Sequence, residues 1–209
     1  MAKFSHVIFD VDGTLIDSGT AVCKSLQQLL METRNQVLPL EECRKYLGIP
    51  SRETIKRFGF PNVEETLTNW ENKFRALKEF IIPYPDAFHT LNTLFQRGKR
   101  LGIVTSRMRE EFAYDNNLRE WSPMFSHVIC AEDTTEHKPN PAPLLAFIDR
   151  SGASIEETLY IADTFDDYLA AKGAGVPFAL ATWSNQNINS NINANFYPKK
   201  LIEILDIVE

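Results

Sequence analysis

Polar side chains of chemically useful types follow several short apolar segments of the chain. Asp10, Thr105 and Asp163 each come directly after an apolar run, and Lys138 follows a fourth run after a loop. Runs of this length, bounded by polar or turn residues, are typical of strands buried on both faces. Because an open parallel sheet binds ligands outside the carboxyl ends of its strands, we expect these four side chains to share one crevice.

The most informative single motif is residues 10–15, DVDGTL. Asp10 and Asp12 are two residues apart, so in an extended chain their side chains project to the same side. Two close carboxylates repel each other, and an oxygen-rich pair of this kind suits Mg²⁺. An Asx-type turn is the alternative interpretation. The position of the motif, after a buried strand that opens an α/β pattern, favours the functional interpretation.

The elements that must position these residues alternate between strand and helix. Strands are predicted at residues 6–9, 101–104, 128–130, 158–162 and 178–180, and helices at 86–96, 110–118, 142–150, before Gly175, and at 199–208. Such alternation predicts an α/β fold with an open, mostly parallel sheet. Six asparagines fall between positions 184 and 195. We interpret the segment 185–195 as a surface loop without chemistry, because asparagine is poor in strands and common in turns.

Residues 17–82 have a different pattern. Apolar residues recur there at steps of three and four, with a short helix at 40–47 ended by Gly48 and a longer helix at 63–81. This spacing is typical of helices that pack on one another. We therefore predict two domains, an α/β core of residues 1–16 and 83–209 and an inserted α-helical domain of residues 17–82.

Composition excludes several classes of function. A net charge of −6 provides no broad basic surface, so nucleic acid is not an expected partner. The three cysteines are scattered and form no CxxC pair, which argues against a zinc knuckle or a disulfide framework. No signal-like segment or apolar run of about 18 residues is present, so we expect a cytoplasmic protein without a membrane partner, as a monomer or weak dimer.

The ordered set of motifs resembles the haloacid dehalogenase superfamily. DVDGTL at 10–15, Thr105 after Ile103-Val104, Lys138 before a proline, and Asp163 with Asp167 match the four motifs of that family in order. The helical insert corresponds to its C1 cap, and the match covers essentially the whole chain. Residues 12–18 and 171–176 are most similar to the phosphoglycolate phosphatase and beta-phosphoglucomutase branches. The resemblance implies a Rossmann-like core and a Mg²⁺-dependent phosphatase that acts on a small phosphorylated metabolite.

The resemblance also implies a role for each matched residue. Asp10 attacks phosphorus and forms an aspartyl-phosphate, and Asp12 protonates the leaving group and then takes a proton from water. Lys138 neutralises charge, and Thr105 donates its hydroxyl to a phosphoryl oxygen. The other roles are metal ligands at Asp10, the backbone carbonyl of Asp12 and Asp163, a supporting carboxylate at Asp167 outside the metal's ligands, and backbone N–H groups around Asp12, Gly13 and Ser106 that cradle phosphate.

Several alternatives remain open at this point. Arg52 either pairs with an anionic group of the substrate or is an ordinary solvated residue, and Arg107 either touches substrate or is solvated. Asp163 alone could be a helix N-cap, and Asp167 a plain helix-face acid. A phosphoglucomutase-type transfer, a pyrophosphatase and a nucleotidase are alternative activities. A signalling receiver domain uses similar residues, but in a different order, and a catalytically silent binding protein would not need the intact motif set.

Overall fold

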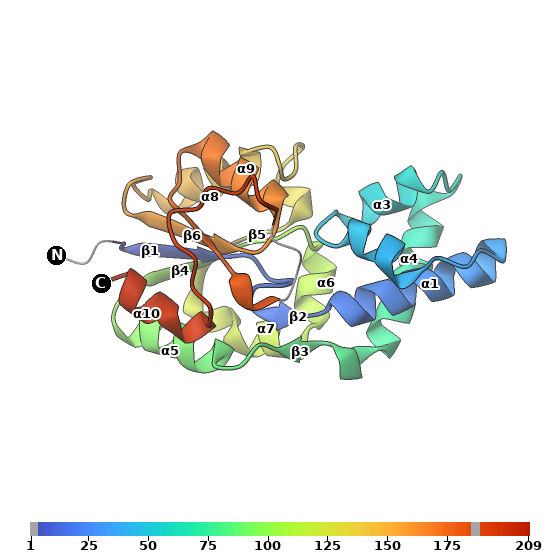
Figure 1. Ribbon diagram of the computed structural model, residues 1–209, viewed down its shortest axis with the longest axis horizontal. Coiled ribbons are helices and arrows are strands. Elements are labelled where there is room, and N and C mark those ends of the chain that lie inside the picture. The colour runs from blue at the N-terminus through green and yellow to red at the C-terminus, as the bar shows by residue number, and fades with distance from the viewer. Residues whose placement is uncertain (1–3, 185–188) are drawn as a thin grey trace.

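The computed structural model describes residues 4–184 and 189–209, and its core is a parallel sheet with the strand order β5-β4-β1-β6-β7 (Figure 1). The strands are β1 His6–Phe9, β4 Arg100–Val104, β5 Phe125–Ile129, β6 Thr158–Ala162 and β7 Phe178–Leu180. The first strand lies in the centre and pairs with β4 and β6. The predicted α/β class and open parallel sheet are confirmed.

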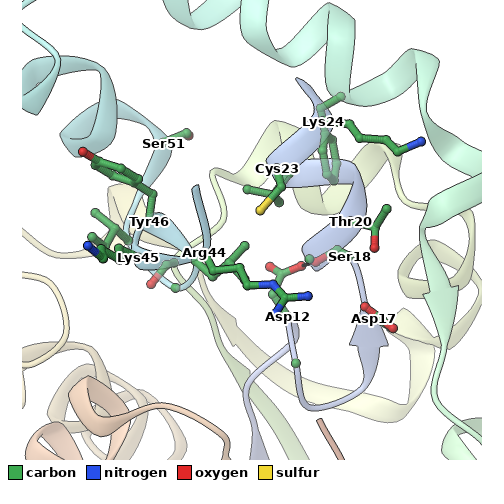
Figure 2. A pocket seen from close by; sticks show the side chains of 18 of the residues that line it. Asp12, Asp17, Ser18, Thr20, Cys23, Lys24, Arg44, Lys45, Tyr46 and Ser51 are labelled. Atoms are coloured by element: carbon green, nitrogen blue, oxygen red, sulfur yellow. Dashed lines mark hydrogen bonds between the residues drawn. The ribbon is translucent and has the colours of Figure 1, made fainter. Parts of the chain in front are cut away.

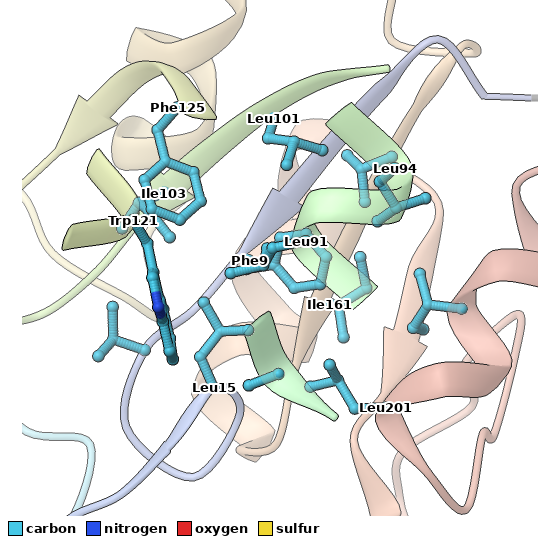
Figure 3. Packing of buried hydrophobic residues seen from close by; sticks show 14 of the residues in the cluster. Phe9, Leu15, Leu91, Leu94, Leu101, Ile103, Trp121, Phe125, Ile161 and Leu201 are labelled. Atoms are coloured by element: carbon cyan, nitrogen blue, oxygen red, sulfur yellow. The ribbon is translucent and has the colours of Figure 1, made fainter. Parts of the chain in front are cut away.

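Alternate residues of each strand belong to different apolar clusters. Val7 and Phe9 of β1 lie in one cluster and Ile8 lies in the other. In β6, Ile161 belongs to the first cluster and Tyr160 to the second. Because successive side chains of a strand point to opposite faces, both faces of the sheet are apolar and both need a covering layer. Figure 3 shows the first of these clusters, packed between the sheet and its helices.

Helices supply the covering layers. On one face lie α5 Ala87–Gln96 and α10 Ile204–Ile207, and on the other lie α8 Ala142–Ser151 and α9 Phe165–Ala174 (Figure 1). Leu91 and Leu94 of α5 and Leu144 and Phe147 of α8 are fully buried in the respective clusters. The sheet is therefore the middle of three layers, and the polar ends of its strands are left for a site.

A separate helical unit is attached to this core. It contains α1 Gly19–Arg34, α2 Leu40–Cys43, α3 Ser51–Arg57 and α4 Val63–Ala76, and it extends to one side of the sheet in Figure 1. Its own apolar cluster includes Trp70, whose Nε1 donates to Ser25 Oγ at 2.8 Å. The short antiparallel strands β2 Ile16–Asp17 and β3 Ile82–Pro83 pair where the chain leaves and re-enters the core. We call this helical unit the cap.

Four predicted helices are shorter or more broken than the periodicity suggested. The helix expected at 110–118 is two helices, α6 Arg109–Tyr114 and α7 Asn116–Trp121, because the Asp115 side chain accepts from the N–H groups that begin α7. The helix at 40–47 is α2 followed by the 3₁₀ turn Arg44–Tyr46, and α4 ends at Ala76 before the 3₁₀ turn Lys78–Phe80. The helix at 199–208 is the 3₁₀ turn Leu201–Glu203 followed by the short α10.

One strand and the asparagine-rich segment differ from the sequence-based predictions. The strand expected at 128–130 begins earlier, at Phe125, and ends at Ile129. Within the asparagine-rich segment, 185–188 lie outside the described residues. The remainder is more than a surface loop, because Asn195 N donates to Phe178 O at 2.9 Å and its Oδ1 accepts from Phe178 N at 2.8 Å. Ile192 is buried there, so this part of the segment covers the edge strand β7.

The described helices include none with the length and apolar character needed to cross a bilayer.

Gly102 allows α8 to pack directly on the middle of β4. A Cβ atom at this position would lie 2.0 Å from Cε2 of Phe147, far inside contact distance. Glycine inside a strand commonly marks such a close approach.

We predict that Gly102→Ala lowers the free energy of unfolding by about 1–3 kcal/mol, the usual cost of overpacking a core. Urea denaturation measures the change. The control is the double variant Gly102→Ala/Phe147→Leu, in which the smaller side chain leaves room for the new methyl group. It should lose less stability than the sum of the two single variants, and strictly additive losses would contradict the proposed contact.

Candidate active site

The site forms around an ammonium group held between two carboxylates. Asp10 follows β1, with its N–H donating to Ile161 O at 2.9 Å, and Lys138 lies in the loop between β5 and α8. Lys138 Nζ is 2.9 Å from Asp10 Oδ1 and 2.6 Å from Oδ1 of Asp167, near the start of α9. All three side chains are buried. Three distant segments of the chain therefore meet in one ion-paired group.

Burial and neighbouring charges shift the pKa values in this group. Burial opposes the charged form of Lys138, but Asp10 and Asp167 outweigh it and raise the pKa of Lys138. Burial, together with Asp167 and Asp12, raises the pKa of Asp10 to about 7, while Lys138 opposes the rise. Lys138 is therefore a fixed cation, and Asp10 is a carboxylate that needs further positive charge to stay ionised at neutral pH.

Asp163, directly after β6, is only partly compensated, by the charge of Lys138. Both of its carboxylate oxygens are buried and neither has a hydrogen-bond partner among the described residues. Burial and the charges of Asp10 and Asp167 raise the pKa of Asp163 well above its ordinary value. Carboxylate oxygens of Asp10, Asp163 and Asp167 lie within 4.8 Å of one another, a grouping that could hold a metal ion.

Gly13 makes room for the unpartnered carboxylate. Its φ of +81° is readily adopted by glycine, and a Cβ atom would lie 2.1 Å from Asp163 Oδ2. The Gly13 N–H donates to Ile16 O at 2.8 Å within the loop. The residue predicted to bind phosphate through its backbone therefore uses its N–H locally, and its lack of a side chain leaves space for Asp163.

The charges of the site favour a divalent cation. Five carboxylates, those of Asp10, Asp12, Asp115, Asp163 and Asp167, face two cations, Lys138 and Arg107, so the site has three more carboxyl groups than cations. The donors are all oxygens, the type that Mg²⁺ and Ca²⁺ prefer. The orphaned Asp163 carboxylate and the space kept by Gly13 show that the residues fit such an ion.

Asp12 is neutralised in a way that the sequence did not predict. Arg107 Nε donates to Asp12 Oδ2 at 2.8 Å and Nη2 donates to Oδ1 at 2.7 Å, and Ser18 Oγ also donates to Oδ1. Burial alone would raise the pKa of Asp12, but Arg107 outweighs it and holds that pKa below its ordinary value. Arg107 is buried, so it is not the solvated residue that was one alternative. The Asp12 carboxylate lies outside the group of three metal-binding candidates. The assignment of its backbone carbonyl as a metal ligand stays a prediction.

Thr105 and Ser106 follow β4 at the same edge of the sheet. Thr105 Oγ1 accepts from the Arg107 N–H at 3.1 Å, and Ser106 Oγ is buried without a partner in the described part of the chain. Ser106 and Arg107 also line the cavity described below. Thr105 thus follows a strand that pairs with β1, at the edge of the sheet where Asp10 also lies.

Both carboxylate oxygens of Asp167 already have partners within the protein. Its Oδ1 accepts from Tyr160 Oη at 2.6 Å as well as from Lys138, and its Oδ2 accepts from Thr164 N at 3.2 Å and from the Thr164 hydroxyl. These bonds suit a carboxylate that supports the ion's ligands from outside. The N-cap of α9 is Thr164, so the alternative role of Asp163 as that cap is wrong.

A cavity of about 840 Å³ lies between the core and the cap. Figure 2 shows Asp12 and Ser18 at its core end, with Cys23 of α1 on one side and the segment that carries Tyr46 and Ser51 on the other. A substrate bound at the carboxylates would therefore meet the cap.

Arg52 lies apart from this cavity. It is not among the residues that line it, and its Nη2 donates to Glu64 Oε2 at 3.0 Å on the exposed surface of the cap. The described structure thus pairs Arg52 within the cap and leaves its contact with substrate a prediction.

Comparison with known proteins identifies the family. Residues 7–181 match the haloacid dehalogenase-like hydrolase family. The chain belongs to this family. Pyrophosphatase PpaX of Oceanobacillus iheyensis is 31% identical over 204 residues, which cover 97% of this chain and 94% of the relative. A phosphoglycolate phosphatase of Aquifex aeolicus is 28% identical over 205 residues, 96% of each chain.

Two solved structures have the same fold as this chain. A subfamily IA, variant 1 hydrolase of Geobacter sulfurreducens superimposes with a TM-score of 0.75 at 25% identity, covering 100% of this chain and 98% of that one. CbbY of Rhodobacter sphaeroides, crystallised with phosphate, gives a TM-score of 0.83 at 19% identity, with 98% and 96% coverage. At that identity the second comparison supports the fold alone.

The raised pKa of Asp163 has a consequence for stability. In the metal-free protein, ionisation of this carboxyl is more costly in the folded state than in the unfolded chain. Below the ordinary pKa of aspartic acid both states are protonated and nothing is lost. As the pH rises through that value towards the higher folded pKa, stability is lost progressively.

We predict that Asp163→Asn stabilises the metal-free protein near neutral pH by about 1–3 kcal/mol, the scale of an uncompensated buried polar group. The gain should vanish in acid, where the wild-type carboxyl is protonated in both states. Urea unfolding in the presence of a chelator, at both pH values, measures the difference. A variant less stable than wild type at neutral pH would contradict the conclusion that Asp163 is an incompletely compensated buried carboxyl group.

Proposed function

We propose that this hydrolase is a Mg²⁺-dependent phosphatase that releases phosphate from a small phosphorylated metabolite through an aspartyl-phosphate at Asp10. The observation that carries the proposal is the juxtaposition of Asp10, Lys138 and the unpartnered Asp163 at one edge of the sheet. A nucleophilic carboxylate, a fixed ammonium group and an orphaned oxygen ligand are the parts that phosphoryl transfer requires.

Each residue has a step to perform. Asp10 Oδ attacks phosphorus while Lys138 offsets charge on the nucleophile and on the phosphoryl oxygens. Thr105 Oγ1 accepts from the Arg107 N–H, so its own hydrogen can be donated to a phosphoryl oxygen. Asp12, which Arg107 keeps ionised in the free enzyme, takes up a proton when the phosphate group binds and gives it to the leaving oxygen. It later takes a proton from the water that hydrolyses the aspartyl-phosphate.

Asp10, Asp163 and the backbone carbonyl of Asp12 would hold Mg²⁺, with Asp167 and its partners fixing the surroundings. The bound ion supplies positive charge that keeps Asp10 ionised and offsets charge on the phosphoryl group. Since the buried carboxylates outnumber the cations that face them, the ion also relieves repulsion inside the site.

The preferred substrate is a small phosphate monoester of the phosphoglycolate or sugar phosphate type. The cavity has room for a small metabolite. A relative whose alignment covers 96% of this chain is named a phosphoglycolate phosphatase. Pyrophosphate is a second candidate, supported by the name of the 31% identical relative. A phosphoglucomutase-type transfer or a nucleotidase would use the same nucleophile.

The proposal requires no nucleic acid or membrane, and a cytoplasmic monomer or weak dimer remains a prediction.

We predict that Asp10→Asn lowers phosphate release about a thousandfold or more, as expected when a covalent nucleophile is removed. A panel of phosphoglycolate, sugar phosphates, nucleotides and pyrophosphate, assayed with Mg²⁺, measures the loss and ranks the substrates. Asp149→Asn, at an exposed position on α8, is the matched control and should retain wild-type rates. Undiminished release by Asp10→Asn would reject the proposed nucleophile.

We also predict that Gly13→Ala weakens Mg²⁺ binding at least about tenfold, because its methyl group occupies the space of Asp163 Oδ2. Isothermal titration calorimetry measures the affinity without substrate. Gly59→Ala is the matched control, since Gly59 has a similar φ of +69° but nothing within 4 Å of the added atom. Equal affinities of the two variants would show that this space is not part of an ion site.

A further inference from the structure

Arg107 is the centre of a buried chain of ion pairs beside the proposed nucleophile. Its guanidinium uses Nε and Nη2 for the two oxygens of Asp12 and directs Nη1 to Asp115 Oδ2 at 3.0 Å. The arginine side chain is 6% exposed and the Asp115 side chain is 3% exposed. All three nitrogen atoms of the guanidinium are therefore committed to carboxylates.

The far end of this chain is fixed to a helix. Asp115 Oδ1 accepts from the N–H groups of Asn117 and Leu118 at 3.0 and 3.3 Å, so it caps α7 while its Oδ2 holds Arg107. Phe74 of the cap lies over the guanidinium, with its ring centroid 6.0 Å from Cζ. Arg107 is thus held on the core side by α7 and covered on the other side by an aromatic ring.

We propose that Arg107 is a positioning residue that aims the Asp12 carboxylate at the leaving group of the substrate. This inference rests on the proposed function, in which Asp12 transfers the proton of that group. Two parallel N–H···O bonds fix the plane of a carboxylate as well as its position. Ser18 Oγ, at the start of α1, adds a third bond to Asp12 from the segment that leads into the cap.

The proton movements show why orientation matters. Arg107 keeps Asp12 ionised in the free enzyme, so Asp12 first takes up a proton from solvent when the negatively charged phosphate group arrives. When the Asp10–phosphorus bond forms and the bond from phosphorus to the leaving oxygen breaks, that proton passes to the leaving oxygen. When water attacks the aspartyl-phosphate, its oxygen bonds to phosphorus, the bond to Asp10 breaks, and Asp12 takes the released proton. A misaimed carboxylate slows the first step chiefly when the leaving oxygen is too basic to depart unprotonated.

Lysine cannot reproduce this arrangement. It has one ammonium group on a flexible stem, which matches the charge of Arg107 but cannot bind both oxygens of Asp12 and also reach Asp115. Arg107→Lys therefore separates the aiming of Asp12 from the simple presence of a positive charge.

The test compares kcat/KM for phosphoglycolate, whose leaving group is an alcohol, with that for p-nitrophenyl phosphate, whose leaving group departs without a proton. We expect Arg107→Lys to lower the first value about a hundredfold, the scale of a misplaced catalytic group, and the second less than about threefold. Asp12→Asn should show the same dependence on the leaving group. The double variant should then lose little more than Asp12→Asn alone.

Two further variants keep the test decisive. Arg109→Lys changes an exposed neighbouring arginine and should leave kcat/KM for both esters unchanged. If Arg107→Lys fails to fold, Asp115→Asn removes the outer anchor while leaving Arg107 in place, and it should give a smaller loss with the same dependence on the leaving group. Equal losses on the two esters, or no loss on either, would overturn the inference. If wild-type enzyme does not hydrolyse phosphoglycolate, the best sugar phosphate of the panel takes its place, because its leaving group is also an alcohol. A wild-type enzyme that releases phosphate from no compound of the panel would instead overturn the proposed function and this inference with it.

Discussion

Lys138 lies between Asp10 and Asp167 in a buried site that still contains more negative than positive charge. Removing carboxylates from water is costly unless each gains a cation or hydrogen bonds. Lys138, Tyr160 and Thr164 satisfy Asp167, and Arg107 and Ser18 satisfy Asp12, but both oxygens of Asp163 are left without partners in the described structure. This excess of carboxylates indicates a cation site, because a divalent cation is the simplest group that would compensate Asp163.

The fold brings these carboxylates together and places the cap over them. Parallel strands end at one edge of the sheet, so residues that are distant in sequence converge there without a local turn that binds them together. The cap places a cavity over the same edge, which lets a phosphorylated molecule contact both the charged group and the cap helices. A hydrolase of the haloacid dehalogenase-like family can thus keep its reactive groups on rigid strand ends and vary its substrate through the cap.

The sequence predicted the parts of this arrangement that depend on local pattern. Apolar runs located β1, β4 and β6, and polar residues at their ends located Asp10, Thr105 and Asp163. It did not predict the partners of Arg107, because Asp12 and Asp115 come from the loop after β1 and from the start of α7, and only the folded chain brings them to the end of β4. The break at Asp115 was missed for the same reason, since helical periodicity continues across it while the side chain caps a new helix. Residues 189–195 form a loop, as the asparagine-rich composition indicates, but composition could not show that Asn195 hydrogen-bonds to Phe178 of β7.

Calorimetric titration of the metal-free enzyme with Mg²⁺, in two buffers of different ionisation enthalpy, tests the central claim most directly. If the ion satisfies a carboxylate that is otherwise protonated, binding must release protons near neutral pH. The account predicts that the observed heat differs between the buffers by an amount that corresponds to this release, and that the release is smaller in Asp163→Asn, in which only Asp10 still loses a proton. Binding with no difference between buffers, or no binding at all, would contradict it.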